Sequence, residues 1–208
     1  ITSHLTDTPV LDDVFDTRGG LEDPKQKLEG YGISLFGEIE ASDILSLRSI
    51  SAWRKDDSST PIDFDALPAV DVDVPGRYHN KQLSQEFQVL VDAGPLNGLI
   101  GAYYLDADAS TPFDVRLFTS FAGLTAFTDA TVETITYAVF GDFTYDISDQ
   151  FSVSAGGRYT WDKREADILR QNYLGGGSPG FGGAGIPFGP PSTDFNGIRK
   201  FKKFTPRL

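Results

Sequence analysis

The sequence predicts an all-β fold, an antiparallel up-and-down transmembrane β-barrel of which this chain forms only a part, with about seven strands. Three observations lead to this prediction. Segments in which apolar and polar residues alternate follow one another along the chain, the links between them are alternately short and long, and aromatic residues gather near the strand ends. Short periplasmic turns, long extracellular loops and aromatic girdles are typical of outer-membrane barrels.

The alternation with period two places the strands and their connections. The short links are expected to be hairpin turns, because they contain Ser-Asp, Gly-Pro and Asn-Gly pairs. The long links are expected to be extracellular loops, residues 1–28 to be the remainder of another such loop, and residues 29–208 to be a partial barrel domain. The expected strands are 30–40, 45–57, 81–92, 99–109, 134–146, 150–165 and 199–208, with short links at 41–44, 93–98 and 147–150 and long loops at 58–80, 110–133 and 166–198.

Composition agrees with β-structure and excludes several functions. The chain is 39% hydrophobic and 12% aromatic, with 22 glycines and neither cysteine nor methionine. Without cysteine it has no disulfide framework and no thiolate metal site. A formal net charge of −12 argues against nucleic-acid binding, which needs a basic surface. No apolar run approaches the ~20 residues of a spanning helix, so a membrane role would have to use strands.

Each of the clearest strands has one apolar and one polar face. Phe151 and Trp161 lie on one face ten positions apart, which corresponds to about 25 Å along a tilted barrel axis, roughly the height of the apolar membrane band. We therefore expect membrane-interface aromatic residues at Tyr137, Tyr145, Phe151, Tyr159 and Trp161. The polar residues of the opposite rows are expected to face the barrel lumen: Glu86, Gln88, Asp142, Arg158 and Asp162.

A soluble β-sandwich is the main alternative for the fold. In that case the aromatic rows would fill a protein core, and the chain could bind carbohydrate through aromatic loops. A second sheet of the same molecule packed over Phe151, Val153, Tyr159 and Trp161 would favour this alternative. The sorting of short and long links favours the barrel.

Several segments resemble one known family. Residues 137–151 (YAVFGDFTYDISDQF), continuing through Gly157, Arg158, Tyr159 and Thr160, resemble a recurrent barrel hairpin of TonB-dependent receptors. Residues 84–87 (SQEF), 101–104 (GAYY) and 205–208 (TPRL) resemble further segments of the same barrel, in the family's usual order. The resemblance extends over roughly residues 29–208.

The resemblance implies a function and a location. Such receptors close a barrel of about 22 strands around an N-terminal plug in the bacterial outer membrane. It implies energy-coupled import of a scarce nutrient such as a ferric siderophore, with the TonB complex contacting the plug region. No plug-like segment is recognisable here, so we expect an internal portion of the barrel. A passive porin or an adhesin remains the alternative within the barrel class.

Candidate ligand-binding residues lie in two of the long loops. Arg77, Tyr78 and His79 end one loop and could contact an anionic or catecholate ligand, although they could equally mark the membrane interface. The glycine- and proline-rich tract at 175–191 carries Phe181 and Phe188 and could form a mobile lid or be disordered. We expect no enzymatic activity, no metal site and no cofactor, because neither His4 nor His79 has a nucleophile or ligand pattern around it.

Basic residues cluster near the expected outer ends of two neighbouring strands. There they would meet lipopolysaccharide phosphates, and outer-membrane lipid and lipopolysaccharide are accordingly expected partners. The alternative is a scattered set of solubilising charges. The six residues are Lys163, Arg164, Arg199, Lys200, Lys202 and Lys203.

Overall fold

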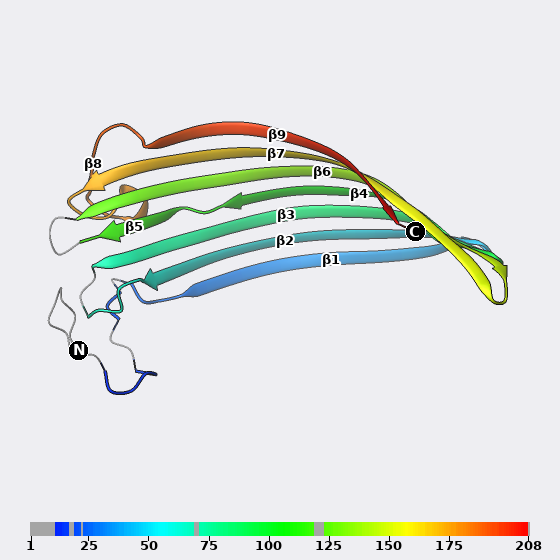
Figure 1. Ribbon diagram of the computed structural model, residues 1–208, viewed down its shortest axis with the longest axis horizontal. Helices are drawn as coiled ribbons and strands as arrows, with labels where there is room; N and C mark the ends of the chain where they lie inside the picture. Colours follow the sequence, from blue (N-terminus) through cyan, green and yellow to red (C-terminus); the bar gives the residue numbers. More distant parts are fainter. Residues whose placement is uncertain (1–10, 17–18, 22, 69–70, 119–122, 208) are drawn as a thin grey trace.

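The protein folds as one antiparallel β-sheet in a single layer (Figure 1). A computed structural model describes residues 11–16, 19–21, 23–68, 71–118 and 123–207. Residues 1–10 of the expected N-terminal loop and Leu208 of the last expected strand lie outside the described residues. The elements are β1 (Lys27–Ser42), β2 (Leu45–Asp63), β3 (Val72–Ala93), β4 (Leu96–Ser110), β5 (Phe113–Leu117), β6 (Leu124–Ser148), β7 (Phe151–Leu174), η2 (Pro179–Phe181), β8 (Ile186–Pro187) and β9 (Thr193–Arg207).

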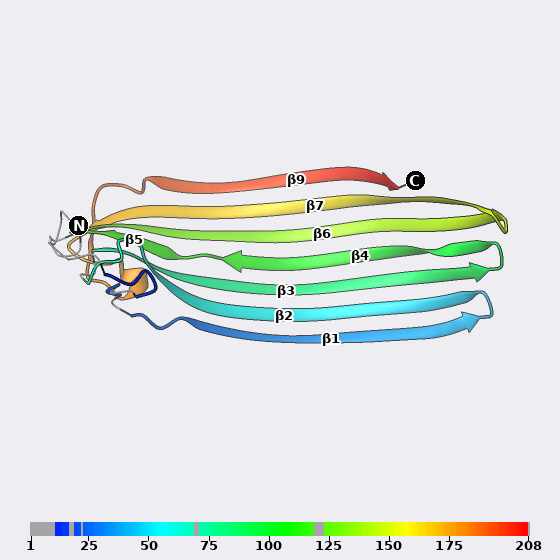
Figure 2. The ribbon, with the colours of Figure 1, turned by 60° about the horizontal axis from the view of Figure 1, so that its bottom comes forward.

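Neighbours in the sequence are neighbours in the sheet, which confirms the predicted up-and-down, all-β fold. The order is β1-β2-β3-β4-β6-β7, with β9 paired to β7, β5 to β3 and β6, and β8 to β7. The three predicted hairpin turns lie together at one end of the sheet (Figure 2). Gly94, in the turn between β3 and β4, has φ +64°, a left-handed conformation that favours glycine.

The strands extend well into the segments predicted to be loops, so the predicted loop limits were wrong. β2 ends at Asp63 and β3 begins at Val72, and β6 and β7 pair as far as Leu124 and Leu174. In the extensions of β3 and β6 the apolar residues change from odd to even positions, so the alternation of each predicted strand stops at its predicted limit while the backbone pairing continues. The apolar residues concerned are Val72, Val74, Leu124, Ala126, Ala130 and Val132. The short strands β5 and β8 were missed altogether.

Strand pairing determines which side chains share a face. Residues Glu38, Arg48, Gln88, Gly101, Phe140 and Arg158 lie directly opposite one another across six strands. We call the face that carries this row the polar face. It comprises the even-numbered residues of β1, β2, β3, β6 and β7 and the odd-numbered residues of β4 and β9; the other residues of these strands form the apolar face.

The apolar face is not covered by a second sheet. The exposed fractions are 69% for Phe151, 57% for Val153, 54% for Tyr137 and 38% for Trp161. A soluble sandwich would bury these side chains, so that alternative is wrong for the part of the chain that the structure describes. Across the same residues, no helix is both long and apolar enough to cross a bilayer.

Candidate functional site

The five predicted interface aromatics all lie on the apolar face. Tyr137 and Trp161 are paired directly across β6 and β7. They belong to a row of rings, because Tyr137 lies 5.1 Å from Tyr104 and Trp161 lies 4.5 Å from Tyr159, measured between ring centroids. Tyr145 and Phe151 lie near the hairpin-turn end of the same two strands. The rings thus form two levels with aliphatic residues between them. We call the level of Tyr104, Tyr137, Tyr159 and Trp161 the upper aromatic row, and that of Tyr145 and Phe151 the lower one. Their place at membrane interfaces stays a prediction.

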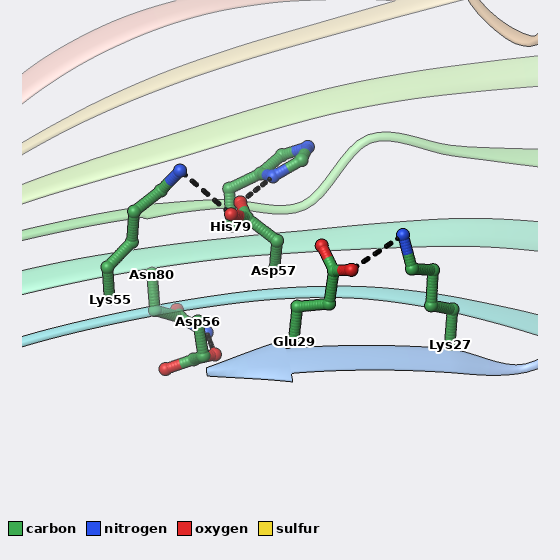
Figure 3. A network of polar contacts seen from close by, with 7 residues as sticks. All are labelled: Lys27, Glu29, Lys55, Asp56, Asp57, His79 and Asn80. Atoms are coloured by element: carbon green, nitrogen blue, oxygen red, sulfur yellow. Dashed lines mark hydrogen bonds and ion pairs between the residues drawn. The ribbon is translucent and has the colours of Figure 1, made fainter. Parts of the chain in front are cut away.

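Charged side chains occupy the apolar face on the far side of the upper aromatic row, away from the hairpin turns (Figure 3). Asp57 accepts from Lys55 Nζ at 2.8 Å and lies 2.6 Å from His79 Nδ1, while Lys27 pairs with Glu29 at 2.8 Å. Hydrogen bonding from Lys55, and secondarily from His79, holds the pKa of Asp57 below its usual value. Asn80 and Asp56 bond to each other on the opposite side of the sheet.

The five predicted lumen residues share the polar face, where they form parts of hydrogen-bonded networks. In the first network, Arg48 donates to Glu38 at 2.9 Å and to Gln88 at 3.2 Å. Gln88 in turn donates to Glu86. Four side chains from three adjacent strands therefore satisfy one another on this face.

A second network on the polar face is centred on β7. The Arg158 guanidinium lies over the rings of Tyr103 and Phe140, 5.4 and 5.6 Å from their centroids. This contact explains why Phe140 breaks the alternation, since its ring packs under a cation on the polar face. Asp162 accepts from Thr136 and Arg164, both at 3.0 Å, and Asp142 pairs with Arg207 at 2.9 Å.

The structure divides the predicted ligand-binding residues. Arg77 and His79 lie on the apolar face, whereas Tyr78 lies on the polar face. Arg77 contacts Phe181: its guanidinium lies 4.7 Å from the ring centroid. The same guanidinium donates a hydrogen bond to Gly180 O at 3.4 Å. Phe188 stands apart and is exposed, with its N–H bonded to Asn172 O. A ligand-binding role for any of the five stays a prediction.

The glycine-rich tract at 175–191 is folded against the sheet, which does not fit disorder, one of the two alternatives for this tract. Ser178 N–H donates to Asp114 Oδ2 at 3.0 Å, and Thr125 Oγ1 donates to Gly176 O at 3.0 Å. Asp114 and Ser178 are fully buried, and Arg116 pairs with Asp114 at 3.3 Å. Sequence analysis missed these anchors. The alternation of apolar residues with Asp114 and Arg116 in residues 113–117 was the signal that could have revealed β5.

A cavity of about 250 Å³ lies beside this tract. Arg77 and Arg116 line it together with Asp73 and Phe181, so its charges are mixed. Within the described residues, no group of three or more histidine, cysteine, aspartate or glutamate side chains is placed to hold a metal ion.

Comparison with known proteins agrees with this geometry. The family described as TonB dependent receptor-like, beta-barrel matches residues 4–208. The chain belongs to this family. A TonB-dependent receptor barrel accounts for the single sheet with one uncovered apolar face and one hydrogen-bonded polar face.

One solved structure is similar to the TonB-dependent receptor chain described here: the ferric yersiniabactin uptake receptor FyuA from Yersinia pestis, with a TM-score of 0.61 and 18% sequence identity. The match covers 87% of this chain and 25% of FyuA, so the chain spans about a quarter of that receptor's length. At this identity the likeness shows the fold. No match was found among curated proteins.

Proposed function

We propose that the chain is part of an outer-membrane receptor that imports a scarce nutrient, a ferric siderophore, by energy-coupled transport. One observation carries the proposal: a single-layer sheet exposes large aromatic and aliphatic side chains on one face and a hydrogen-bonded polar network on the other. Hydrocarbon outside and water inside a barrel suit these two faces.

The polar face supports an aqueous interior. Arg158, Asp142 and Asp162 lie within the strands and not at their ends. If these positions faced an apolar core, burying the three charges would carry a large desolvation cost. A water-filled lumen removes most of that cost. The proposed lumen set of Glu86, Gln88, Asp142, Arg158 and Asp162 would then line the passage or contact a plug through which the TonB complex acts.

Charge on the polar face supports an anionic ligand. The basic residues of β7 and β9 on that face outnumber the acidic residues Asp142 and Asp162 nearby. A positive wall in a confined passage attracts an anionic chelate. The structural likeness to the ferric yersiniabactin uptake receptor FyuA adds support for an iron chelate. The basic residues are Arg158, Arg164, Arg170, Arg199, Lys203 and Arg207.

Orientation also refines the proposed ligand contacts. Tyr78, on the polar face, would reach a ligand inside the barrel. Arg77 and Phe181 would instead hold the 175–191 tract against the outer side of the wall, with His79 bound to Asp57. Phe188 would remain available at the exposed end of the tract.

The test is uptake of iron chelates by the bacterium that encodes this chain. Under iron limitation, we expect deletion of the gene and deletion of TonB each to abolish uptake of one radiolabelled ferric chelate. Uptake that depends on the gene but persists without TonB would instead identify a passive porin. Full uptake after deletion of the gene, for every chelate on which the bacterium grows, would refute an importer of iron chelates.

A further inference from the structure

We propose that the apolar face holds one phosphorylated glycolipid of the outer leaflet across β6, β7 and β9. Its phosphate would bind Lys200 and Lys202, and one acyl chain would lie in a groove over Gly141 and Gly157. The inference rests on the proposed outer-membrane location and names a specific lipid site on that surface.

The six clustered basic residues divide between the two faces. Arg164, Arg199 and Lys203 lie on the polar face, so only half of the predicted cluster can meet lipid. On the apolar face, Lys200 is paired with Lys163, and Lys202 with Trp161. Lys163 bonds to Glu165 at 3.1 Å, whereas Lys200 and Lys202 are exposed and form no ion pair with any residue the structure describes. Two free ammonium groups thus lie beside the upper aromatic row.

On the hairpin-turn side of these lysines, the apolar face contains a groove of about 500 Å³. Gly141 and Gly157 are paired across β6 and β7 and leave its floor without side chains. The Phe204 ring lies over one edge, since a Cβ atom on Gly157 would come within 2.8 Å of it. Val139, Phe143 and Tyr159 form the rest of the rim.

Spacing along β9 joins the two parts. Lys202, Phe204 and Pro206 succeed one another on the apolar face, so the lysine lies about 13 Å from the level of the groove at ~3.3 Å per residue. One lipid molecule can span this separation, with its phosphate at the lysines and an acyl chain in the groove. The lysines lie toward the long-link end of the strands, which is the extracellular end in barrels of this kind. Phosphorylated glycolipid occupies that leaflet, and it is therefore the occupant we infer.

The experiment measures binding of lipid A bisphosphate to the full receptor purified in detergent, by native mass spectrometry and by titration. The variant Lys200→Gln/Lys202→Gln removes both charges. Arg199→Gln/Lys203→Gln is the matched control, because it removes two charges from the same strand on the opposite face. Gly141→Leu fills the groove, where a Cβ atom meets no heavy atom closer than 3.4 Å.

We expect Lys200→Gln/Lys202→Gln to weaken binding about 30-fold, from the usual contribution of a lysine at an anionic lipid surface. The control should bind within about twofold of the unaltered protein, Lys200→Arg/Lys202→Arg should retain binding, and removal of the lipid phosphates should abolish the difference between variants. Gly141→Leu should weaken binding about fivefold at unchanged unfolding midpoint.

Several results would overturn the lipid site. One is equal affinity in the lysine variant and the unaltered protein, and another is an equal loss in the control. Binding that ignores the phosphates would do the same. All three leave the iron-uptake test untouched, so failure of this inference is distinguishable from failure of the proposed function.

Discussion

The buried carboxylate of Asp114 offers a direct test of how the glycine-rich tract is anchored. Its Oδ2 accepts from Ser178 N–H at 3.0 Å and from Arg116 Nε at 3.3 Å, and only the first of these contacts ties down the tract. A hydrogen bond to a charged group contributes about 2 kcal/mol, and one to a neutral group about 1 kcal/mol. Asp114→Ala should therefore open the tract about 30-fold more often, and Asp114→Asn about fivefold more often.

Hydrogen exchange at the Ser178 amide measures this opening. The expected order of exchange rates is Asp114→Ala, then Asp114→Asn, then the unaltered protein, with amides in the middle of β6 and β7 unchanged. Asp167→Asn, which alters an exposed carboxylate on β7, serves as the control and should leave the Ser178 rate unchanged. Equal Ser178 rates in the unaltered protein and both Asp114 variants would refute the reasoning.

Three further predictions concern other contacts. Arg77→Leu removes the cation from the Phe181 ring, worth about 1 kcal/mol, and should speed protease cleavage within residues 175–191 about fivefold, whereas Arg77→Lys should have a smaller effect. Val139→Arg on the apolar face, between the bilayer midplane and the predicted interface at Tyr137, should lower the free energy of unfolding in lipid vesicles by about 1–3 kcal/mol, while Ser154→Arg on the polar face should lower it by less than about 1 kcal/mol. Carboxyl NMR titration should show the pKa of Asp57 rising more in Lys55→Gln than in His79→Gln, because Lys55 is the larger cause of its lowered pKa. The stabilisation from these contacts is present at neutral pH and is lost as the pH falls through the pKa of Asp57.

Several features of the site were predictable because strand geometry is strictly periodic. Alternation in the segment around Phe151 and Trp161 assigned each residue to a face without knowledge of its neighbours, and the pairing of β6 with β7 confirmed that assignment. The hairpin turns were predictable for a similar reason, since Gly94 and its neighbours carry the conformational requirement locally.

The tertiary structure alone decided which distant residues meet. Arg77 lies over Phe181, and Asp114 holds Ser178, 64 residues along the chain, because register and loop path bring them together. The extensions of β3 and β6 were likewise missed, because their apolar residues lie on the opposite face from those in the rest of each strand. Backbone hydrogen bonds form between any two aligned strands, so pairing continues past the point where the apolar residues change face.

The sequence by itself therefore determined the all-β class, the two faces and the turn end of the sheet, since each depends on local composition at a spacing of two residues. Only the tertiary structure decided the length of the strands, the anchoring of the glycine-rich tract and the pairing of Lys200 and Lys202 with Lys163 and Trp161 of β7. These features depend on interstrand register, and register is a property of pairs of segments that no single segment encodes.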